Sequence, residues 1–265
     1  MRNVLMGALA AVAAAAVFAT SSGGAAAQAL DRILKEKKVR ITAEVTSPPF
    51  GTLDKDGKPD GSEIATARQL AKDLGVELEL VQVTGPNRIP ALLSGRADVA
   101  ISSLSITADR AKTVAFAPPH GALSIVIAGP AGTTIKSAAD LAGKRIGLTR
   151  GTLEEAEVPK IAPLGTNLVY FDDIAATIQA VLSGQVDGAG MSAFAAKSVA
   201  DRNPQRPIEA KFTVRTAFYA AAVKPGDQDL LNWIRTWVFI NKQNGVLAEI
   251  YEKYTGVKLV ELPPL

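Results

Sequence analysis

The stretch Ala91-Leu-Leu-Ser-Gly-Arg-Ala-Asp-Val-Ala-Ile-Ser-Ser103 has a related copy further along the chain, Ala180-Val-Leu-Ser-Gly-Gln-Val-Asp-Gly-Ala-Gly-Met-Ser192. Each copy has the pattern of a helix end, a glycine that permits a left-handed turn, and a short buried strand. A second related pair is Lys38-Val-Arg-Ile-Thr42 and Lys144-Arg-Ile-Gly-Leu-Thr149. Repeated helix–strand units predict an α/β protein with two lobes, each a mostly parallel sheet flanked by helices.

Hydrophobic periodicity and breaker residues place the remaining elements. Strands are expected at 39–44, 76–83, 123–128, 145–149, 168–171 and 212–223, and a further short strand leads from the first repeat into the helix that starts at Thr107. Helices are expected at 62–74, 87–94, 137–141, 152–161, 174–183, 193–201, 227–244 and 246–254, with a further helix starting at Thr107. Asp60 and Glu63 have the spacing of a capping box for the first of these helices. The segment Phe116-Ala-Pro-Pro-His-Gly121 breaks the pattern and predicts a crossing between lobes. The predicted lobes are therefore 38–120 with 219–265, and 121–218, joined by a two-stranded hinge.

Composition narrows the classes of function. The net charge is only +3 and both signs are interspersed, so no nucleic-acid partner is expected. The chain has one histidine and no cysteine, which argues against a transition-metal site, and no cofactor is expected. Asp54, Asp56 and Asp60 lack the remainder of a calcium-loop motif and predict a solvated turn.

The N-terminus has the layout of a secretory signal peptide. Arg2 precedes an apolar run over 4–19, and Ala25-Ala-Ala27 is a candidate cleavage site. A membrane anchor is the alternative, but the run is short for a bilayer span. We therefore expect residues 1–27 to be removed. The chain has no cysteine, so no lipid can be attached to a mature N-terminal cysteine, and the mature protein is expected to be soluble and periplasmic. We also expect a monomer.

The residues that follow the first repeat predict an anion site. In Ile101-Ser-Ser-Leu-Ser-Ile-Thr-Ala-Asp-Arg110, a buried strand ends in hydroxyl residues, and Thr107 is a good N-cap. Arg110 supplies a planar donor fork that matches a carboxylate. The alternative for a lone arginine is a surface ion pair. The position at the end of a strand favours the binding site, because ligands of open α/β sheets lie at strand carboxyl ends.

Several motifs, in order and spacing, resemble one family over 39–256: the periplasmic solute-binding proteins of polar amino-acid ABC importers, also called family 3 extracellular solute-binding proteins. The motifs are Pro48-Pro-Phe50, Ile89-Pro-Ala-Leu-Leu-Ser-Gly-Arg-Ala-Asp98, Ser102-Ser-Leu-Ser-Ile-Thr107 with Arg110, Leu141-Ala-Gly-Lys-Arg-Ile-Gly147, Gly151-Thr152 and Leu247-Ala-Glu-Ile-Tyr-Glu-Lys-Tyr254. The resemblance implies a two-lobed periplasmic binding fold that closes on a small carboxylate ligand and delivers it to an inner-membrane ABC permease. It implies a binding protein and not an enzyme.

The resemblance also implies roles for individual residues. Arg110 corresponds to the arginine that clamps the ligand's α-carboxylate, assisted by Ser103 and Ser105. Gly151 and Thr152 open a helix whose N–H groups reach the same carboxylate, which agrees with the anion preference of helix N-termini. Phe50, Leu153 and Ser192 are the further candidates from these motifs.

Three departures leave the ligand open. Ser192 stands where the family usually has an acid for the ligand's α-ammonium, and Ser47 and Gly85 stand where aromatic residues are common. Arg150 stands where a neutral residue is frequent. Either another acid, such as Glu44, replaces the missing one, or the ligand has no ammonium.

Arg150 is open to two interpretations. In the first, Arg150 holds a second carboxylate of the ligand, which would favour an acidic amino acid, a dicarboxylate or another organic acid. In the second, Arg150 pairs with a carboxylate of the protein, either Glu154 or Glu155 at the mouth of the cleft or Glu44 across it. Some proteins of this fold are cyclohexadienyl dehydratases, but the acid that they need is absent at Ser192. His120 is expected to pack or hydrogen-bond locally at the hinge, and three aromatic residues are expected in the core: Trp233, Trp237 and Tyr251.

Overall fold

The computed structural model describes residues 29–264, so the predicted signal peptide lies outside the described residues. The first lobe is built on a five-stranded sheet in the order β4-β1-β5-β12-β6. Its strands are β1 (Lys38–Ala43), β4 (Glu77–Gln82), β5 (Val99–Ala100), β6 (Ala115–Phe116) and β12 (Ala222–Val223). Strands β4, β1 and β5 are parallel, and β12 runs antiparallel to both of its neighbours.

The second lobe repeats this plan with the order β11-β7-β10-β8-β9. Its strands are β7 (Gly121–Pro130), β8 (Arg145–Thr149), β9 (Asn167–Phe171), β10 (Gly188–Ser192) and β11 (Ile208–Tyr219). Here β10, β8 and β9 are parallel and β7 is the strand that runs against its neighbours. Two lobes with mostly parallel sheets confirm the predicted fold class.

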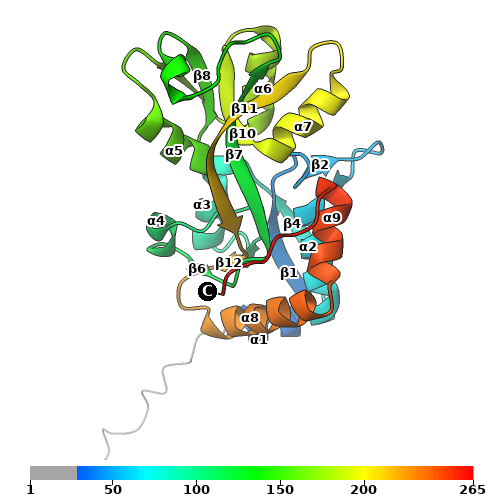
Figure 1. Cartoon of the computed structure of the whole chain (residues 1–265). Coiled ribbons are helices and arrows are strands. Elements are labelled where there is room, and N and C mark those ends of the chain that lie inside the picture. The colour runs from blue at the N-terminus through cyan, green and yellow to red at the C-terminus, as the bar shows by residue number, and fades with distance from the viewer. Residues whose placement is uncertain (1–28, 265) are drawn as a thin grey trace, which may run out of the picture.

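Two long strands link the lobes. Strands β7 and β11 are paired antiparallel from Gly121 with Tyr219 to Pro130 with Ile208, and Figure 1 shows them running from the upper lobe to the lower one. Gly121 is required at the lower end, because a Cβ there would lie 2.1 Å from the ring of Tyr219. An isolated bridge between Ser105 and Tyr219 ties the same end to the loop before Arg110.

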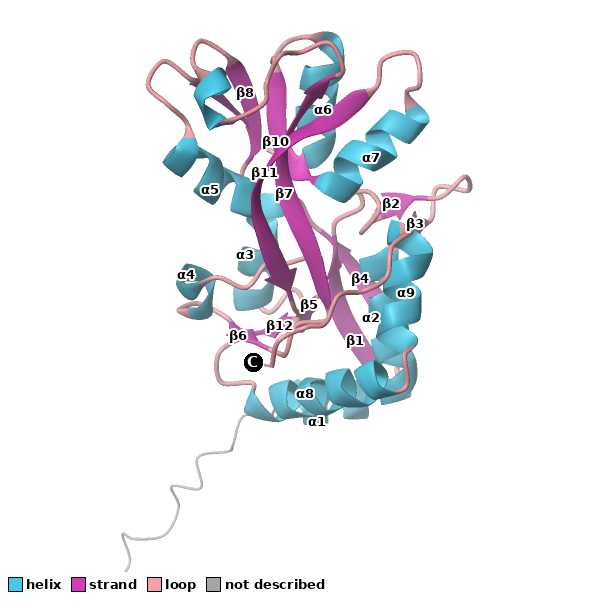
Figure 2. Ribbon diagram, in the orientation of Figure 1, coloured by secondary structure: helices cyan, strands magenta, loops and turns pink. Residues whose placement is uncertain are grey.

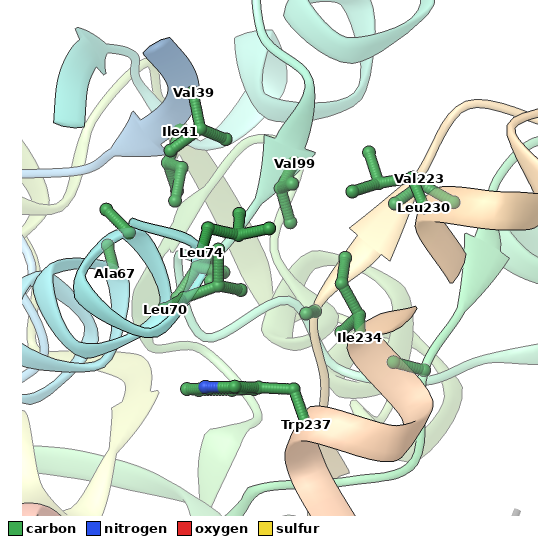
Figure 3. Close-up of a cluster of buried hydrophobic side chains, with 14 of the residues drawn as sticks. Val39, Ile41, Ala67, Leu70, Leu74, Val99, Val223, Leu230, Ile234 and Trp237 are labelled. Carbon is green, nitrogen blue, oxygen red and sulfur yellow. The ribbon is translucent and has the colours of Figure 1, made fainter. Parts of the chain in front are cut away.

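The helices cover the sheets because each buries one apolar stripe. In the first lobe, α2 (Ser62–Leu74) and α8 (Gln228–Gln243) pack on the sheet, with α1 (Ala29–Glu36) and α9 (Val246–Thr255) beside them (Figure 2). Figure 3 shows the resulting core, where Leu70 from α2, Ile234 from α8 and Val99 from β5 belong to one buried cluster. Trp237 and Tyr251 are buried, as predicted, and Trp233 is partly buried against the same core.

In the second lobe the helices are α5 (Leu153–Ile161), α6 (Ile174–Ser183) and α7 (Ala193–Arg202). Strand β8 and helix α6 have the predicted bounds, as does α2 in the first lobe. Short elements complete the fold: β2 (Thr52–Leu53), β3 (Pro59–Asp60), η1 (Gly85–Asn87), α3 (Arg88–Leu93), α4 (Ala108–Ala111) and η2 (Ala138–Leu141). Within residues 29–264, no helix is long and apolar enough to cross a membrane, and no group of side chains is arranged to hold a metal ion.

Two expectations were wrong. The capping box at α2 does not form: the N-cap is Gly61, without a side-chain hydrogen bond. The predicted strand at 212–223 is two strands, β11 and β12, in different sheets. His120 packs at the hinge as expected, with its ring edge-on to that of Tyr219. Its Nε2 also lies 3.0 Å from Oε1 of Glu63, so the supposed capping acid reaches the hinge.

Candidate functional site

A cavity lies between the lobes, where strands of both sheets end. Strand β8 ends at Thr149 and β10 at Ser192, and both residues line it, as expected for the carboxyl edge of an open α/β sheet. The first lobe and the hinge contribute Ser47, Phe50, Arg88, Ser103, Ser105, Arg110 and Leu123. The second lobe contributes Thr149, Thr152, Leu153, Glu154, Ile174, Thr177, Ile178, Gly190, Met191, Ser192 and Ala195.

Arg110 is held in place by backbone oxygens on both sides of the cavity. It lies on α4, whose N-cap is Thr107, as predicted. Its Nη1 donates to the Ser105 carbonyl at 2.8 Å and its Nη2 donates to the Gly151 carbonyl at 2.9 Å. Burial and then the like charge of Arg88 lower the pKa of Arg110 to about 10, so the guanidinium stays charged at neutral pH. An arginine has five N–H groups, so donors remain for an anion.

The loop that carries Ser103 and Ser105, before Arg110, is held by a hydrogen bond to Glu63. Ser103 has φ of 47°, a left-handed conformation that costs a residue with a side chain of order 1–3 kcal/mol and that clusters at functional sites. Its N–H donates to Oε2 of Glu63 at 2.8 Å, and the same carboxylate contacts His120. Glu63 therefore connects the loop that lines the cavity to the start of the hinge.

On the opposite wall, the N-terminus of α5 faces the cavity. Thr152 is its N-cap and accepts from the Glu155 N–H at 3.3 Å. The carboxylate of Glu155 accepts from the Gly151 N–H at 2.7 Å. The helix dipole adds positive potential at this end, which suits an anion next to Arg110.

Gly151 is where the two lobes touch. Its φ is 72°, and a Cβ at this position would lie 2.5 Å from Cα of Pro86. Likewise a Cβ at Gly85 would lie 2.6 Å from the Arg150 carbonyl oxygen. Because Gly85 has no side chain, the backbone of 85–86 in the first lobe can approach the backbone of 150–151 in the second. Gly151 also borders a smaller pocket beside the cavity.

Arg88 is a second buried arginine of the cavity, and sequence reasoning did not single it out. Its guanidinium donates to three carbonyl oxygens, those of Gly85, Ser102 and Gly151, at 3.0, 3.0 and 2.8 Å. Its Nη1 lies 3.5 Å from Oε2 of Glu44. Burial raises the pKa of Glu44, and the positive charge of Arg88, which lowers that pKa, only partly offsets the effect of burial. Glu44 is thus buried behind Arg88, outside the cavity lining.

The predicted site residues divide into two groups. Seven of them line the cavity together: Phe50, Ser103, Ser105, Arg110, Thr152, Leu153 and Ser192. Arg150 does not line it; it lies 3.5 Å from Asp172 and its guanidinium is 5.4 Å from the ring centre of Tyr170. The interpretation in which Arg150 pairs with Glu44, Glu154 or Glu155 finds no such pair among the described residues. The partner Asp172 was missed because it follows a different strand.

Glu154 is the other ionisable lining residue that was not a predicted ligand-binding residue; sequence reasoning named it only as a possible partner of Arg150. It comes two residues after Thr152, and that spacing from the Gly-Thr pair was the available signal. Ser192 lines the cavity, but its hydroxyl caps α7 by accepting from the Ala195 N–H at 3.0 Å. The Ser192 hydroxyl is uncharged, so it supplies no negative charge for an ammonium group of a ligand.

Comparison with known proteins identifies a family of similar chains. Residues 39–257 match the model of the bacterial extracellular solute-binding proteins, family 3. The L-cystine-binding protein TcyJ of Escherichia coli is 28% identical over 235 residues, which are 88% of each chain.

Two solved structures share the fold over nearly their whole length. The solute receptor for L-cysteine of Neisseria gonorrhoeae has a TM-score of 0.81 at 28% identity and covers 88% of this chain and 99% of its own. The ancestral amino-acid-binding protein AncCDT-1, a precursor of cyclohexadienyl dehydratase, has a TM-score of 0.78 at 30% identity and covers 85% and 99%. The family match spans most of the chain, and the chain therefore belongs to the bacterial extracellular solute-binding proteins of family 3.

Proposed function

We propose that this chain is the periplasmic binding component of an ABC importer and that it captures a small amino acid by its α-carboxylate. Arg110 carries the proposal: a charged guanidinium in a cavity between two lobes, with N–H groups left for an anion. The N-terminus of α5 adds donors from the other lobe. Relatives that bind cystine, cysteine and arginine support an amino acid as the ligand class.

The same contacts suggest how the ligand acts on the protein. A carboxylate that touches Arg110 in one lobe and the α5 N-terminus in the other stabilises only the closed arrangement. Ligand binding then shifts the population toward closure, which the permease would recognise. We assign residues 38–120 and 219–265 to the first lobe and residues 121–218 to the second, with closure about β7 and β11.

An organic acid without an ammonium remains the alternative ligand, but its second carboxylate has no partner in Arg150, which lies outside the cavity lining. For the dehydratase alternative, the expected result is no formation of phenylpyruvate from prephenate above background in a spectroscopic assay.

The test is isothermal titration of wild type and Arg110→Ala with the common amino acids, cystine and a set of organic acids. Truncating one partner of a buried charge pair costs about 3–5 kcal/mol, so binding by Arg110→Ala should fall below detection for a micromolar ligand. Arg150→Ala is the matched control, because it removes a neighbouring arginine that is half exposed and outside the lining. Equal affinity of Arg110→Ala and wild type would refute the assignment.

A further inference from the structure

The cavity is lined by three ionisable side chains among the described residues: Arg88, Arg110 and Glu154. Arg88 already has a counter-charge, because Glu44 lies 3.5 Å from it and the two side chains are 5% and 2% exposed. One positive group, Arg110, and one negative group, Glu154, are left facing the ligand space. This charge pattern matches a zwitterion.

Glu154 differs from the other acids of its helix. Glu155 accepts from the Gly151 N–H, and Glu157 pairs with Lys160 and Arg215. Within residues 29–264, the Glu154 carboxylate has no hydrogen bond or ion pair to another side chain. It is therefore available to a ligand cation.

Glu154 also lies against the strand end where the family's usual acid is missing. A Cβ placed on Gly190 would lie 3.2 Å from Cβ of Glu154, so the base of the Glu154 side chain rests on β10. Ser192 is two residues further along the same strand and lines the same cavity. The carboxylate that Ser192 lacks is thus supplied to this part of the cavity from the neighbouring helix α5.

We propose that Glu154 accepts the α-ammonium of the ligand and that the ligand is a zwitterionic amino acid with an uncharged side chain. This inference rests on the proposed function, in which Arg110 holds the carboxylate. A buried ammonium without a counter-charge is costly, and so is a second charge of either sign on the ligand. The rest of the side chain would meet apolar walls, formed by Phe50, Leu123, Leu153, Ile174, Ile178 and Met191.

The experiment compares paired ligands on paired variants. Thermal shift with the twenty amino acids and cystine selects the tightest amino acid, and titration calorimetry then measures it and its des-amino analogue, the same carboxylic acid without the ammonium. The variants are wild type, Glu154→Gln and Glu157→Gln, which makes the same acid-to-amide change on α5 at a residue outside the cavity lining. Circular dichroism checks that each variant is folded.

The expected result is that wild type binds an amino acid with an uncharged side chain at least tenfold more tightly than its des-amino analogue. Glu154→Gln should lose at least tenfold for the amino acid and be unchanged or tighter for the analogue, and Glu157→Gln should match wild type. Three results would overturn the inference while Arg110 still holds a carboxylate: an unchanged affinity of Glu154→Gln for the amino acid, preference for an acid without an ammonium, or preference for a charged side chain. Absence of any carboxylate ligand would instead refute the proposed function.

Discussion

Replacing Gly151 with alanine should block closure without unfolding the protein. The new Cβ would lie 2.5 Å from Cα and N of Pro86 and 2.6 Å from the carbonyl carbon of Gly85. These are backbone atoms of the other lobe, so no side chain can rotate away to relieve the contact. The loops would have to separate by about 1 Å to reach ordinary van der Waals distance.

That separation determines the size of the effect. The Gly151 carbonyl accepts from Nη2 of Arg88 at 2.8 Å and from Nη2 of Arg110 at 2.9 Å, and both bonds join the lobes. Hydrogen bonds to charged groups contribute about 1.5–3 kcal/mol each, so losing both at the lower limit costs about 3 kcal/mol. Because this cost applies to the closed form alone, ligand affinity should fall roughly 150-fold.

The assay is titration of the tightest amino acid, with small-angle scattering to follow closure. Gly143→Ala is the matched control, since Gly143 has φ of 71° and a Cβ there would meet nothing within 4 Å. Both variants should lose similar stability from the strained φ, of order 1 kcal/mol. If Gly151→Ala binds and closes like Gly143→Ala, contact between the lobes at Gly151 does not accompany ligand binding and the reasoning is refuted.

Two further predictions concern stability. Asp98 is buried and accepts three hydrogen bonds from Arg40, at 2.8, 3.2 and 2.6 Å, as well as one from Arg32; Asp98→Asn should therefore cost about 2 kcal/mol in urea unfolding. Asp201→Asn, which removes an exposed pair with Lys197, should change stability by under about 0.5 kcal/mol, and equal losses would contradict the prediction. Hydrogen bonds from Arg145 lower the pKa of Asp187, so this carboxylate stabilises the fold above its unfolded pKa of about 4, and that contribution is lost as the pH falls through the lower folded pKa. Asp187→Asn should be less stable than wild type at pH 6 and approach it below about pH 4 in the same assay; a constant difference across pH would exclude this linkage.

Features set by local patterns were predicted well. Helix α2 has its predicted bounds because its apolar residues recur with the helical period and Gly75, at φ of 68°, ends it. Thr107 caps α4 as expected, because an N-cap depends on three neighbouring residues. The repeat of helix, glycine and strand was enough to predict two lobes with similar sheets.

Pairings between distant segments were not predictable in the same way. The spacing of Asp60 and Glu63 fits a capping box, yet the carboxylate of Glu63 is 3.0 Å from His120 and accepts from Ser103. His120 is brought there by the crossing of the chain between lobes, and Ser103 by the loop after β5. In the same way the partner of Glu44 is Arg88, in a helix 44 residues away along the sequence, and no period or spacing reports that contact.

The sequence alone determined most of the helices and strands, the duplicated architecture and the arginine that follows a strand, because these follow from hydrophobic period, turn residues and helix caps along a few residues. Only the tertiary structure decided which charges meet in the cavity. It left Arg150 outside the cavity lining, paired Arg88 with Glu44 and brought Glu154 and Arg110 into the same lining. The physical reason is that a buried charge must find its partner in space, and that partner comes from whichever strand end or helix the packing of the two lobes brings near.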